Sequence, residues 1–272
     1  MSIVIIKCGG AVLQTPEQIS AMMQEIARLK TQGYHPIVVH GGGPEISRIC
    51  KTMGIAPRFV NGLRVTDSEM MPIVQMVLIG KINKELVLQL HQKGASAIGL
   101  SGYDGNLFLA TQLEHPEGHD LGFVGKIVRV NCQFLMRWIE MGFVPVIAPV
   151  APSVEGVAFN LNADHVASQM AISLQAEHLV FLSDVPGVLD GVKKIDTIES
   201  DEAANLIERG AITGGMIPKV ESALAALEQG VSQVHILDGK NPHSLFLHLQ
   251  EGKQMGTTFI PKRPKSTIVN FR

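Results

Sequence analysis

The chain has 272 residues, of which 46% are hydrophobic and 18% are charged, and its net charge at neutral pH is −2. This composition excludes an intrinsically disordered protein, and the small net charge gives no basic field that would recruit nucleic acid. No uninterrupted apolar segment reaches the roughly 18 residues that a membrane-spanning helix requires. The three cysteines, Cys8, Cys50 and Cys132, are odd in number and widely separated. That pattern favours free thiols in a reducing, cytoplasmic compartment.

Two glycine-rich turns follow the first two predicted strands. The first strand, residues 3–6, runs directly into Lys7 and the glycine pair 9–10, and the second strand, residues 36–39, leads to three glycines at 41–43. Turns without side chains let backbone N–H groups approach an anion closely. Two such turns, one of them beside a lysine, predict a site for a phosphoryl group that is being transferred. The second turn alone also fits a tight strand-to-helix connection, and it lacks the closing residues of a Walker A loop.

Short apolar strands and amphipathic helices alternate along most of the chain. The first helix begins with a capping box at Thr15 and ends at Gly33. Further strands are predicted over 97–100, 144–148, 179–182 and 234–237, and further helices over 133–141, 164–174 and 217–229. This alternation predicts an α/β fold whose mostly parallel sheet is covered on both faces, with ligands at the carboxyl ends of its strands. We expect a boundary near Ala176, between lobes over 1–176 and 177–272.

Two segments depart from this alternation. Residues 105–131 show short β segments and turns, which predict a hairpin that forms a lid or a rim. Residues 68–93 form a predicted helix that Ser68 caps, and the first half of this helix is apolar on nearly every side. Such a helix must be buried all round. It is either a central core helix or a helix that packs against its copy in a homodimer, and we favour the homodimer.

The chemistry that these residues support is phosphoryl transfer to a carboxylate. That reaction needs no general base, because the acceptor is already ionised, but it needs two anions aligned and the charge on the transferring group neutralised. Candidate cations are Lys7 and Lys219, and Asp164 is the acid that would hold them. A cation in the first turn of a helix opposes the helix dipole, so a purely structural role for Lys219 is disfavoured. Taken singly, Lys219 also fits a surface lysine and Asp164 a helix-start acid.

Two residues beside the glycine turns have a structural interpretation. Cys8 follows Lys7, but nothing nearby in the sequence serves as its base, so we expect it to pack at the strand end. His40 is expected to hydrogen-bond the glycine turn rather than to contact a substrate.

Six motifs then appear in a fixed order along the chain. They are Ile-Ile-Lys-x-Gly-Gly, His-Gly-Gly-Gly-Pro, Asn-Gly-Leu-Arg-Val-Thr, Asn-x-Asn-Ala-Asp, Leu-Ser-Asp-Val-Pro-Gly-Val-Leu and Gly-Gly-Met-Ile-Pro-Lys. Together they resemble the amino acid kinase family from the first strand to about residue 260, and the third and fourth point to its acetylglutamate kinase branch. The resemblance implies an open αβα sandwich around a mainly parallel central sheet. It also implies ATP-dependent phosphorylation of the side-chain carboxylate of N-acetyl-L-glutamate, the second step of arginine biosynthesis.

The resemblance implies roles for the residues at the matching positions. Lys7 and Lys219 would bracket the phosphoryl group, and Asp164 would orient both ammonium groups and keep them charged. Backbone N–H groups near Gly10 and Gly42 would stabilise the oxygens of the phosphoryl group. Arg64 would grip the substrate α-carboxylate with its planar fork. The other residues implied to line the substrate pocket, on the N-terminal lobe, are Gly42, Gly43 and Asn160. The residues implied to hold ATP, on the C-terminal lobe, are Asp184, Val185, Pro186, Gly187, Val188, Leu189, Ala211, Ile212 and Thr213. Mg²⁺ would arrive with ATP, held by phosphates and water, so no protein metal ligands are predicted.

Other functions remain open from the sequence. The nearest is a kinase for an N-acetyl- or carrier-linked aminoadipate of lysine biosynthesis, whose substrate differs by one methylene, worth only about 1–3 kcal/mol in a pocket. A non-catalytic acetylamino-acid sensor would be expected to lack one of the two lysines or the aspartate, and a dehydrogenase would need the missing dinucleotide fingerprint. Members of the family that arginine inhibits carry an extra N-terminal helix, so the resemblance implies the arginine-insensitive, dimeric kind. Residues 261–272 lie beyond the match and receive no role.

Overall fold

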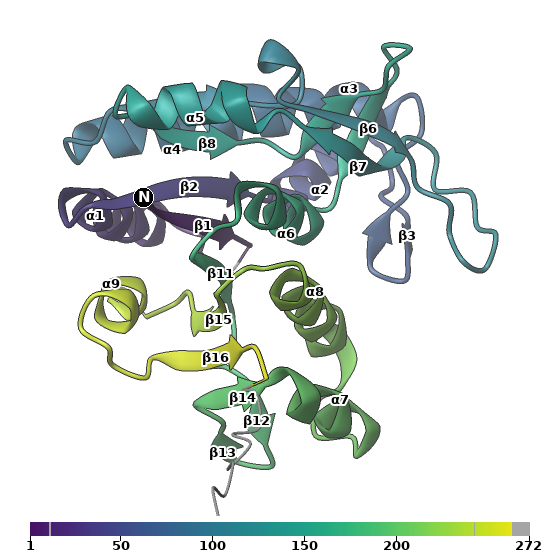
Figure 1. The fold of residues 1–272 in the computed structure, drawn as a ribbon. Coiled ribbons are helices and arrows are strands. Elements are labelled where there is room, and N and C mark those ends of the chain that lie inside the picture. Colours follow the sequence, from purple (N-terminus) through teal and green to yellow (C-terminus); the bar gives the residue numbers. More distant parts are fainter. Residues whose placement is uncertain (11, 242, 263–272) are drawn as a thin grey trace, which may run out of the picture.

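The computed structural model describes residues 1–10, 12–241 and 243–262 of the chain (Figure 1). Its central sheet contains β1 (Ser2–Cys8), β2 (Tyr34–His40), β5 (Ala97–Leu100), β8 (Val144–Ile147), β11 (His178–Ser183), β14 (Thr197–Glu199), β15 (Gln233–Asp238) and β16 (Gly256–Ile260). The order of these eight strands across the sheet is β14-β16-β15-β11-β1-β2-β8-β5. The pairs from β5 to β15 are all parallel, whereas β16 runs antiparallel to β15. The predicted mainly parallel sheet is therefore confirmed.

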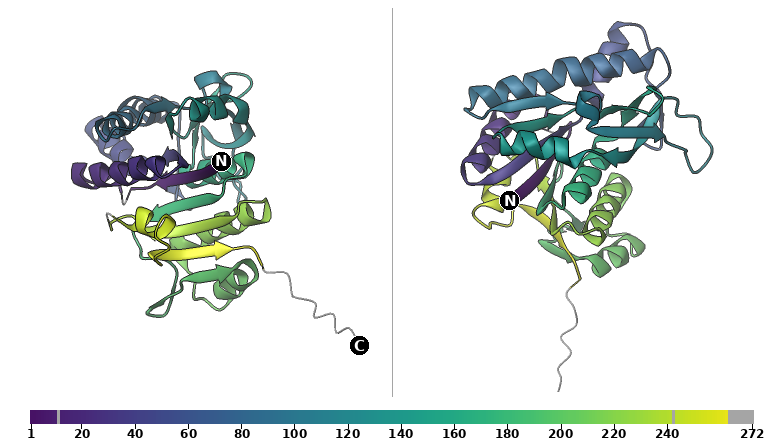
Figure 2. Two further views of the ribbon diagram at one scale, coloured as in Figure 1. Left: turned by 60° about the vertical axis from the view of Figure 1, so that its left-hand side comes forward. Right: turned by 45° about the horizontal axis from the view of Figure 1, so that its top comes forward.

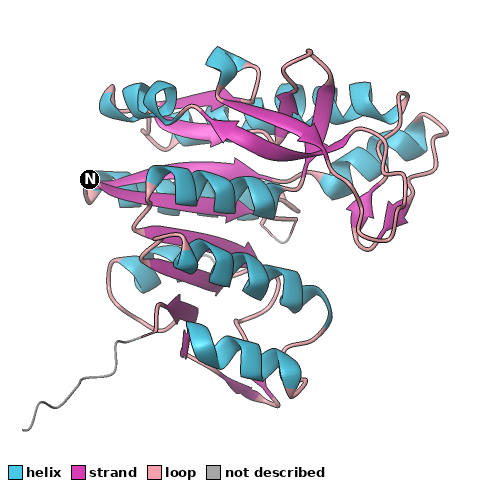
Figure 3. Ribbon diagram, turned by 45° about the vertical axis from the view of Figure 1, so that its right-hand side comes forward, coloured by secondary structure: helices cyan, strands magenta, loops and turns pink. Residues whose placement is uncertain are grey.

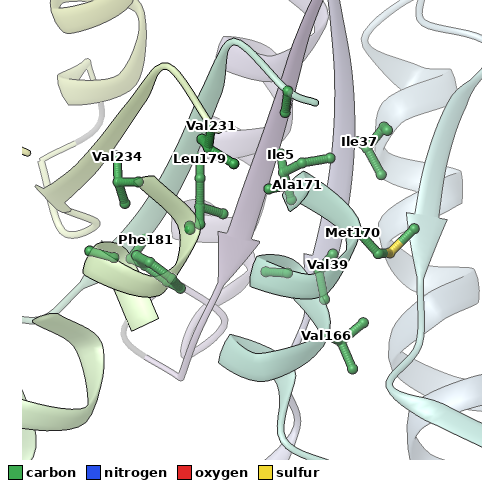
Figure 4. Packing of buried hydrophobic residues seen from close by; sticks show 14 of the residues in the cluster. Ile5, Ile37, Val39, Val166, Met170, Ala171, Leu179, Phe181, Val231 and Val234 are labelled. Atoms are coloured by element: carbon green, nitrogen blue, oxygen red, sulfur yellow. The ribbon is translucent and has the colours of Figure 1, made fainter. Parts of the chain in front are cut away.

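Helices cover both faces of this sheet (Figures 2 and 3). They are α1 (Pro16–Thr31), α2 (Gly43–Thr52), α3 (Met70–Gln75), α4 (Asn83–Gln92), α5 (Cys132–Glu140), α6 (Ala163–Leu174), α7 (Ser200–Glu208), α8 (Ile217–Glu228) and α9 (Ser244–Leu249). Alternate residues of β1 point to opposite faces. Ile3 and Ile5 pack in one buried cluster with α5, α6, α7 and α8 (Figure 4), and Val4 and Ile6 pack in a second with α1, α3, α4 and α9. Because both faces are buried, the strands are continuous apolar runs in the sequence.

A second, smaller sheet forms the rim beside the glycine turns. It contains β6 (Phe108–Gln112), β7 (Val124–Val130), β10 (Ala158–Leu161) and β9 (Val150–Pro152), in that order. The antiparallel pair β6–β7 is the hairpin predicted within 105–131. A short hairpin of β3 (Phe59–Val60) and β4 (Leu63–Arg64) lies beside it, joined by a bridge between Thr66 and Gly122. Another short hairpin, β12 (Leu189–Asp190) and β13 (Lys193–Lys194), follows β11.

The long apolar helix is present but differs in detail from the prediction. It consists of α3, a π-helical segment Met76–Ile82 and α4 in direct succession. Its first N–H is capped by Asp67, whose Oδ1 accepts a 2.9 Å hydrogen bond from the backbone N of Met70, so the prediction of Ser68 as the cap is wrong. Most of its apolar residues are buried within this chain, but Met76 is 56% exposed. Packing inside one chain thus accounts for most of the helix, and Met76 and Leu88, which is 55% exposed, are left to solvent.

Within the described residues, no helix combines the length and the apolar character needed to cross a membrane. The central sheet continues across residue 176, since β1 pairs with β11 over five residues. The division into lobes at Ala176 remains a prediction.

Candidate functional site

The two glycine turns lie side by side at the carboxyl edge of the central sheet. Cys8 and His40, the last residues of β1 and β2, are paired in register, and the N–H of Gly41 donates to the carbonyl of Cys8 at 2.9 Å. The second turn leads into α2 through Gly42. A Cβ atom on Gly42 would lie 2.5 Å from Cδ2 of Leu78, so a side chain there would displace the long helix's buried residues from this turn. Both predicted turns are therefore brought to one place.

Asp164 joins two lysines from distant parts of the chain. Its Oδ1 lies 2.9 Å from Nζ of Lys7, on β1, and its Oδ2 accepts a 3.0 Å hydrogen bond from Nζ of Lys219, in the first turn of α8. The three side chains are mostly buried, with exposed fractions of 11% for Lys7, 23% for Asp164 and 19% for Lys219. The structure thus places three of the predicted catalytic residues in one ion-pair group.

Local sequence explains how each member of this group is held. The side chain of Asn162 caps α6, because its Oδ1 accepts from the backbone N of Asp164 at 2.8 Å. This cap fixes Asp164 in the first turn, where the helix dipole favours an anion. Lys7 reaches the carboxylate across Gly9, which has no side chain to fill that space: a Cβ at Gly9 would lie 2.9 Å from the lysine Nζ. Lys219 is set by the start of α8, where Pro218 follows Ile217.

The carboxylate of Asp164 is ionised at neutral pH. Burial acts to raise the pKa of Asp164, but the charges and hydrogen bonds of Lys7 and Lys219 together lower it below its ordinary value. Each of its two oxygens lies within 3.0 Å of one lysine ammonium nitrogen. Asp164 therefore serves as an anchor for two cations and not as a general base.

A cavity of about 260 Å³ opens beside Lys7 and Asp164, and several predicted residues line it. They are Gly10, Gly42, Gly43, Arg64 and Asn160. Arg64 is 8% exposed, and its Nη2 donates to the carbonyl of Gly43 and to Oγ of Ser47, both at 2.8 Å. Nη1 is buried and has no hydrogen-bond partner among the residues that the structure describes. A buried donor of this kind is costly unless a ligand satisfies it, so the cavity is suited to a carboxylate.

Asn160 reaches the same cavity from β10. Its amide Nδ2 donates to Oγ1 of Thr66 at 3.0 Å, which orients the side chain. Thr66 also holds the β3–β4 hairpin to the rim, since its backbone accepts from the N–H of Phe123 and donates to the carbonyl of Leu121. The position of Arg64 and that of Asn160 are therefore coupled through one residue.

The residues predicted to hold nucleotide lie at the same edge of the sheet. The segment 184–189 directly follows β11, and residues 211–213 come shortly before α8. Val188 and Ile212 are each only 1% exposed, and the N–H of Val188 donates to Oγ1 of Thr257 at 2.8 Å. Their side chains therefore shape the segment from within rather than facing solvent. The assignment of these segments to a nucleotide site stays a prediction.

Two structural interpretations of neighbouring residues are confirmed. Cys8 is fully buried, and burial raises the pKa of its thiol to about 12, which makes it an inert packing residue. His40 is also fully buried, with Nδ1 3.0 Å from the carbonyl of Gly41 and Nε2 3.3 Å from Nδ2 of Asn83. Burial lowers its pKa to about 4. These partners fit a neutral imidazole that donates through Nδ1 and accepts through Nε2.

The sequence reasoning missed several residues around the site. Ser47 supports Arg64, and the ring of Phe59 lies 4.7 Å from the guanidinium carbon of Arg64. A second cavity, of about 300 Å³, adjoins Asp164 and Lys219 and is also lined by Lys126 and His165. Ser47 and Phe59 carried no local signal, because only the folded positions of α2 and β3 bring them to the arginine. Asn162, in contrast, is of a residue type that the sequence alone identifies as a helix cap.

Comparisons with known proteins agree with this architecture. Residues 2–238 match the model of the amino acid kinase family. The acetylglutamate kinase of Symbiobacterium thermophilum is 46% identical over 266 residues, which cover 94% of this chain and 91% of that protein. That of Pelotomaculum thermopropionicum is also 46% identical, covering 93% and 90%. The solved N-acetylglutamate synthase of Neisseria gonorrhoeae, complexed with coenzyme A and N-acetyl-glutamate, has a TM-score of 0.87 at 25% identity. This chain spans 60% of the length of that synthase.

The chain belongs to the amino acid kinase family. Within the family, relatives that match it along nine tenths of their length place it in the acetylglutamate kinase branch. The resemblance and the αβα fold class predicted from the sequence are thereby confirmed.

Proposed function

We propose that the chain transfers the γ-phosphoryl group of ATP to the side-chain carboxylate of N-acetyl-L-glutamate, giving N-acetyl-L-glutamyl 5-phosphate, the second step of arginine biosynthesis. The observation that carries this proposal is the group formed by Lys7, Asp164 and Lys219 at the carboxyl edge of the sheet. The names of the curated relatives support the choice of acceptor. Asp164 and the two lysines are accordingly proposed as catalytic residues, together with Gly10.

The two lysines would neutralise the charge that develops during transfer. An ammonium group has three N–H donors; Lys219 directs one toward Asp164, and Lys7 pairs with the same carboxylate as an ion pair. The remaining donors of Lys7 and Lys219 are then available to phosphoryl oxygens from two sides. Because the ion pairs are already formed, no reorganisation is needed when charge shifts to those oxygens, which is how preorganised donors accelerate a reaction.

The cavity beside Lys7 would hold the acceptor in line with the phosphoryl group. Nη1 of Arg64 would take the α-carboxylate, because it is the buried donor without a protein partner among the described residues. Asn160, Gly42 and Gly43 line the same cavity and would complete the contacts to the substrate. The acceptor carboxylate at the far end of the molecule would then lie toward Lys7.

The donor set fits a Mg²⁺ that enters with the nucleotide. Among the residues that the structure describes, Asp164 is the one acidic side chain that lines these two cavities, and both of its oxygens face lysines. A Mg²⁺ ion would therefore be held by phosphate oxygens and water, as this hard cation allows. When bound, it would supply further neutralisation of the phosphate charge. The segments 184–189 and 211–213 are proposed to hold the nucleotide itself.

Acyl phosphate formation tests the proposal directly. Purified protein with Mg-ATP and N-acetyl-L-glutamate is expected to form a product that hydroxylamine traps as a hydroxamate. The same assay with N-acetyl-aminoadipate addresses the alternative acceptor, which is longer by one methylene. Turnover of aminoadipate without turnover of acetylglutamate would reverse the assignment, and no hydroxamate with either acceptor would refute the kinase proposal.

We further infer that the protein is a cytoplasmic homodimer. Met76 is 56% exposed and Leu88 is 55% exposed on the long apolar helix, and the half-buried Ile79 lies one turn after Met76. The three cysteines are free thiols, in keeping with a reducing compartment. Light scattering coupled to size-exclusion chromatography should give twice the mass of one chain, and Met76→Glu should shift it toward the monomer. A monomer of the unaltered protein at micromolar concentration would contradict the dimer.

A further inference from the structure

The loop between β6 and β7 contains a cluster of metal-binding side chains that the proposed reaction does not use. His115, Glu117 and His119 each offer one ligand atom, and these three atoms lie within 4.8 Å of one another. Nε2 of His119 is 3.2 Å from a carboxylate oxygen of Glu117, and the two imidazole rings have their centroids 5.0 Å apart. Small side-chain rotations would place each of the three ligand atoms roughly 2.0–2.2 Å from a shared metal ion, the distance that Zn²⁺ coordination requires.

We propose that His115, Glu117 and His119 form a binding site for a divalent transition cation of the Zn²⁺ type. Two imidazoles and one carboxylate match the preferences of such cations, whereas Mg²⁺ prefers a set made of oxygen atoms. Three protein ligands leave a tetrahedral position for water. Glu114 and Asp120 flank the cluster, so the loop carries a local negative charge that attracts a cation.

The geometry also assigns one ring nitrogen of His115 to the metal and the other to a contact with Asn61. The backbone N–H of Glu117 donates to Nδ1 of His115 at 3.2 Å, so Nδ1 is the unprotonated nitrogen of this ring, and a metal bound there would replace that hydrogen bond. Nε2 of the same ring is 3.2 Å from the side-chain amide of Asn61, at the turn of the β3–β4 hairpin. A metal on Nδ1 fixes the proton on Nε2. That N–H then donates to the amide oxygen of Asn61, after the amide group turns over.

The site therefore ties the loop to the hairpin that carries Arg64. The hairpin and the loop already lie together at one side of the molecule (Figure 1), where Thr66 bridges to Gly122. A second contact, between His115 and Asn61, is present at the hairpin turn, and metal binding would fix the orientation of its imidazole. This consequence for the substrate pocket rests on the proposed function, whereas the metal site itself does not.

A second histidine cluster in the chain does not have the geometry of a metal site. His178, His235 and His248 form a row in which Nδ1 of the first faces Nε2 of the second at 3.0 Å, and Nδ1 of the second faces Nε2 of the third at 2.9 Å. These nitrogens satisfy one another in hydrogen bonds and do not converge on one point. Among the described residues, only the 115–119 cluster brings three ligand atoms together.

Equilibrium dialysis against ZnCl₂, with untagged full-length protein and without nucleotide, tests the site. We expect one Zn²⁺ per chain, with no comparable binding of Mg²⁺. His119→Ala and His115→Ala should each weaken Zn²⁺ binding roughly 10-fold or more. The control is His243→Ala, which removes an exposed histidine that also faces a glutamate, Glu25, but belongs to no such cluster among the described residues. Unchanged binding in the double variant of His115 and His119, or no binding to the unaltered protein, would overturn the proposal.

Hydrogen exchange separates the metal site from its link to the hairpin. Zn²⁺ is expected to slow amide exchange over 113–121 and over 59–64. Asn61→Ala should keep Zn²⁺ binding and its protection of the loop but lose the protection of the hairpin. Protection of the hairpin that persists in Asn61→Ala would refute the link. Because neither experiment contains ATP or acetylglutamate, a failed kinase assay would leave both results interpretable.

Discussion

Gly9 makes room for the ammonium group of Lys7. A Cβ atom at position 9 would lie 2.9 Å from Nζ of Lys7, closer than real Cβ contacts allow, whereas the neighbouring backbone is farther away. The turn after β1 is therefore glycine for two reasons: its backbone N–H groups are accessible, and the lysine crosses the space that a side chain would fill. The position of Nζ of Lys7 thus depends on Gly9 having no Cβ atom.

Gly9→Ala is expected to displace Lys7 without unfolding the protein. The flexible lysine end gives way more easily than backbone, so the melting temperature should stay nearly unchanged while turnover falls. A displacement of about 1 Å near reacting atoms lowers a rate by roughly 10²-fold. Gly215→Ala is the matched control, because a Cβ there meets nothing within 4 Å although Gly215 lies only four residues before Lys219. Hydroxamate formation measures both variants, and a full rate in Gly9→Ala would contradict the role given to Lys7.

Asp164→Asn is expected to separate binding from turnover. The substitution keeps the shape of the side chain but leaves the ammonium groups of Lys7 and Lys219 without a shared anion. ATP should bind at least as tightly, because two unpaired cations attract phosphates, whereas turnover should fall by roughly 10²–10³-fold for loss of preorganisation. Lys7→Ala and Lys219→Ala should lose similar factors in turnover. Calorimetric titration with ATP and the hydroxamate assay check the two parts, and weaker ATP binding with unchanged turnover would refute the assignment.

Arg64→Lys is expected to weaken binding of acetylglutamate. Lysine cannot use one nitrogen on Gly43 and Ser47 while offering a second to the substrate, as the guanidinium does. Loss of one charge-assisted hydrogen bond should raise KM for acetylglutamate by roughly 10–100-fold and leave turnover at saturation nearly unchanged. Arg58→Lys is the control, because Arg58 is exposed and pairs loosely with Asp67 at 3.8 Å. Equal effects of the two substitutions would show that Arg64 does not hold the substrate.

The sequence predicted the centre of the sheet better than its edge. β1, β2, β8 and β11 are buried on both faces, so each is a continuous apolar run that is visible without a structure. β16 was missed because Thr257 and Thr258 interrupt its apolar pattern. Thr257 is nevertheless fully buried, since its Oγ1 donates to the carbonyl of Ile195 and accepts from the N–H of Val188. Those partners come from distant segments, which a local pattern does not reveal.

The candidate site shows a similar division. The glycine turns are local features, and their meeting follows from the parallel order of β1 and β2. Nothing local relates Lys7 to Lys219, and spacing alone left Lys219 open until the resemblance supplied its role. Their shared contact with Asp164 comes from the packing of α6 and α8 on one face of the sheet. Ser47 was out of reach, because only the folded position of α2 turns it toward Arg64.

Acid is expected to destabilise the protein through its buried histidines. Burial lowers the pKa of His40 to about 4 and that of His235 well below its ordinary value, whereas in the unfolded chain both titrate near 6.5. As the pH falls below 6.5, the unfolded state takes up protons that the folded state does not. The free energy of unfolding therefore decreases, by about 1.4 kcal/mol per pH unit for each such group. For His40 the decrease in the free energy of unfolding continues down to about pH 4. Above pH 6.5 His40 is neutral in both the folded and the unfolded state, so it causes no dependence on pH there.

His40→Gln isolates one of these contributions. The variant should be less stable at pH 7.5, because Gly41 and Asn83 lose a well-placed partner, but its stability should fall less steeply between pH 6.5 and pH 4.5. Urea unfolding at a series of pH values measures the slope. Val38→Ala is the control, since it also destabilises the buried strand β2 but removes no titrating group, so its slope should equal that of the unaltered protein. If His40→Gln keeps the full slope, His40 is not a source of the acid sensitivity.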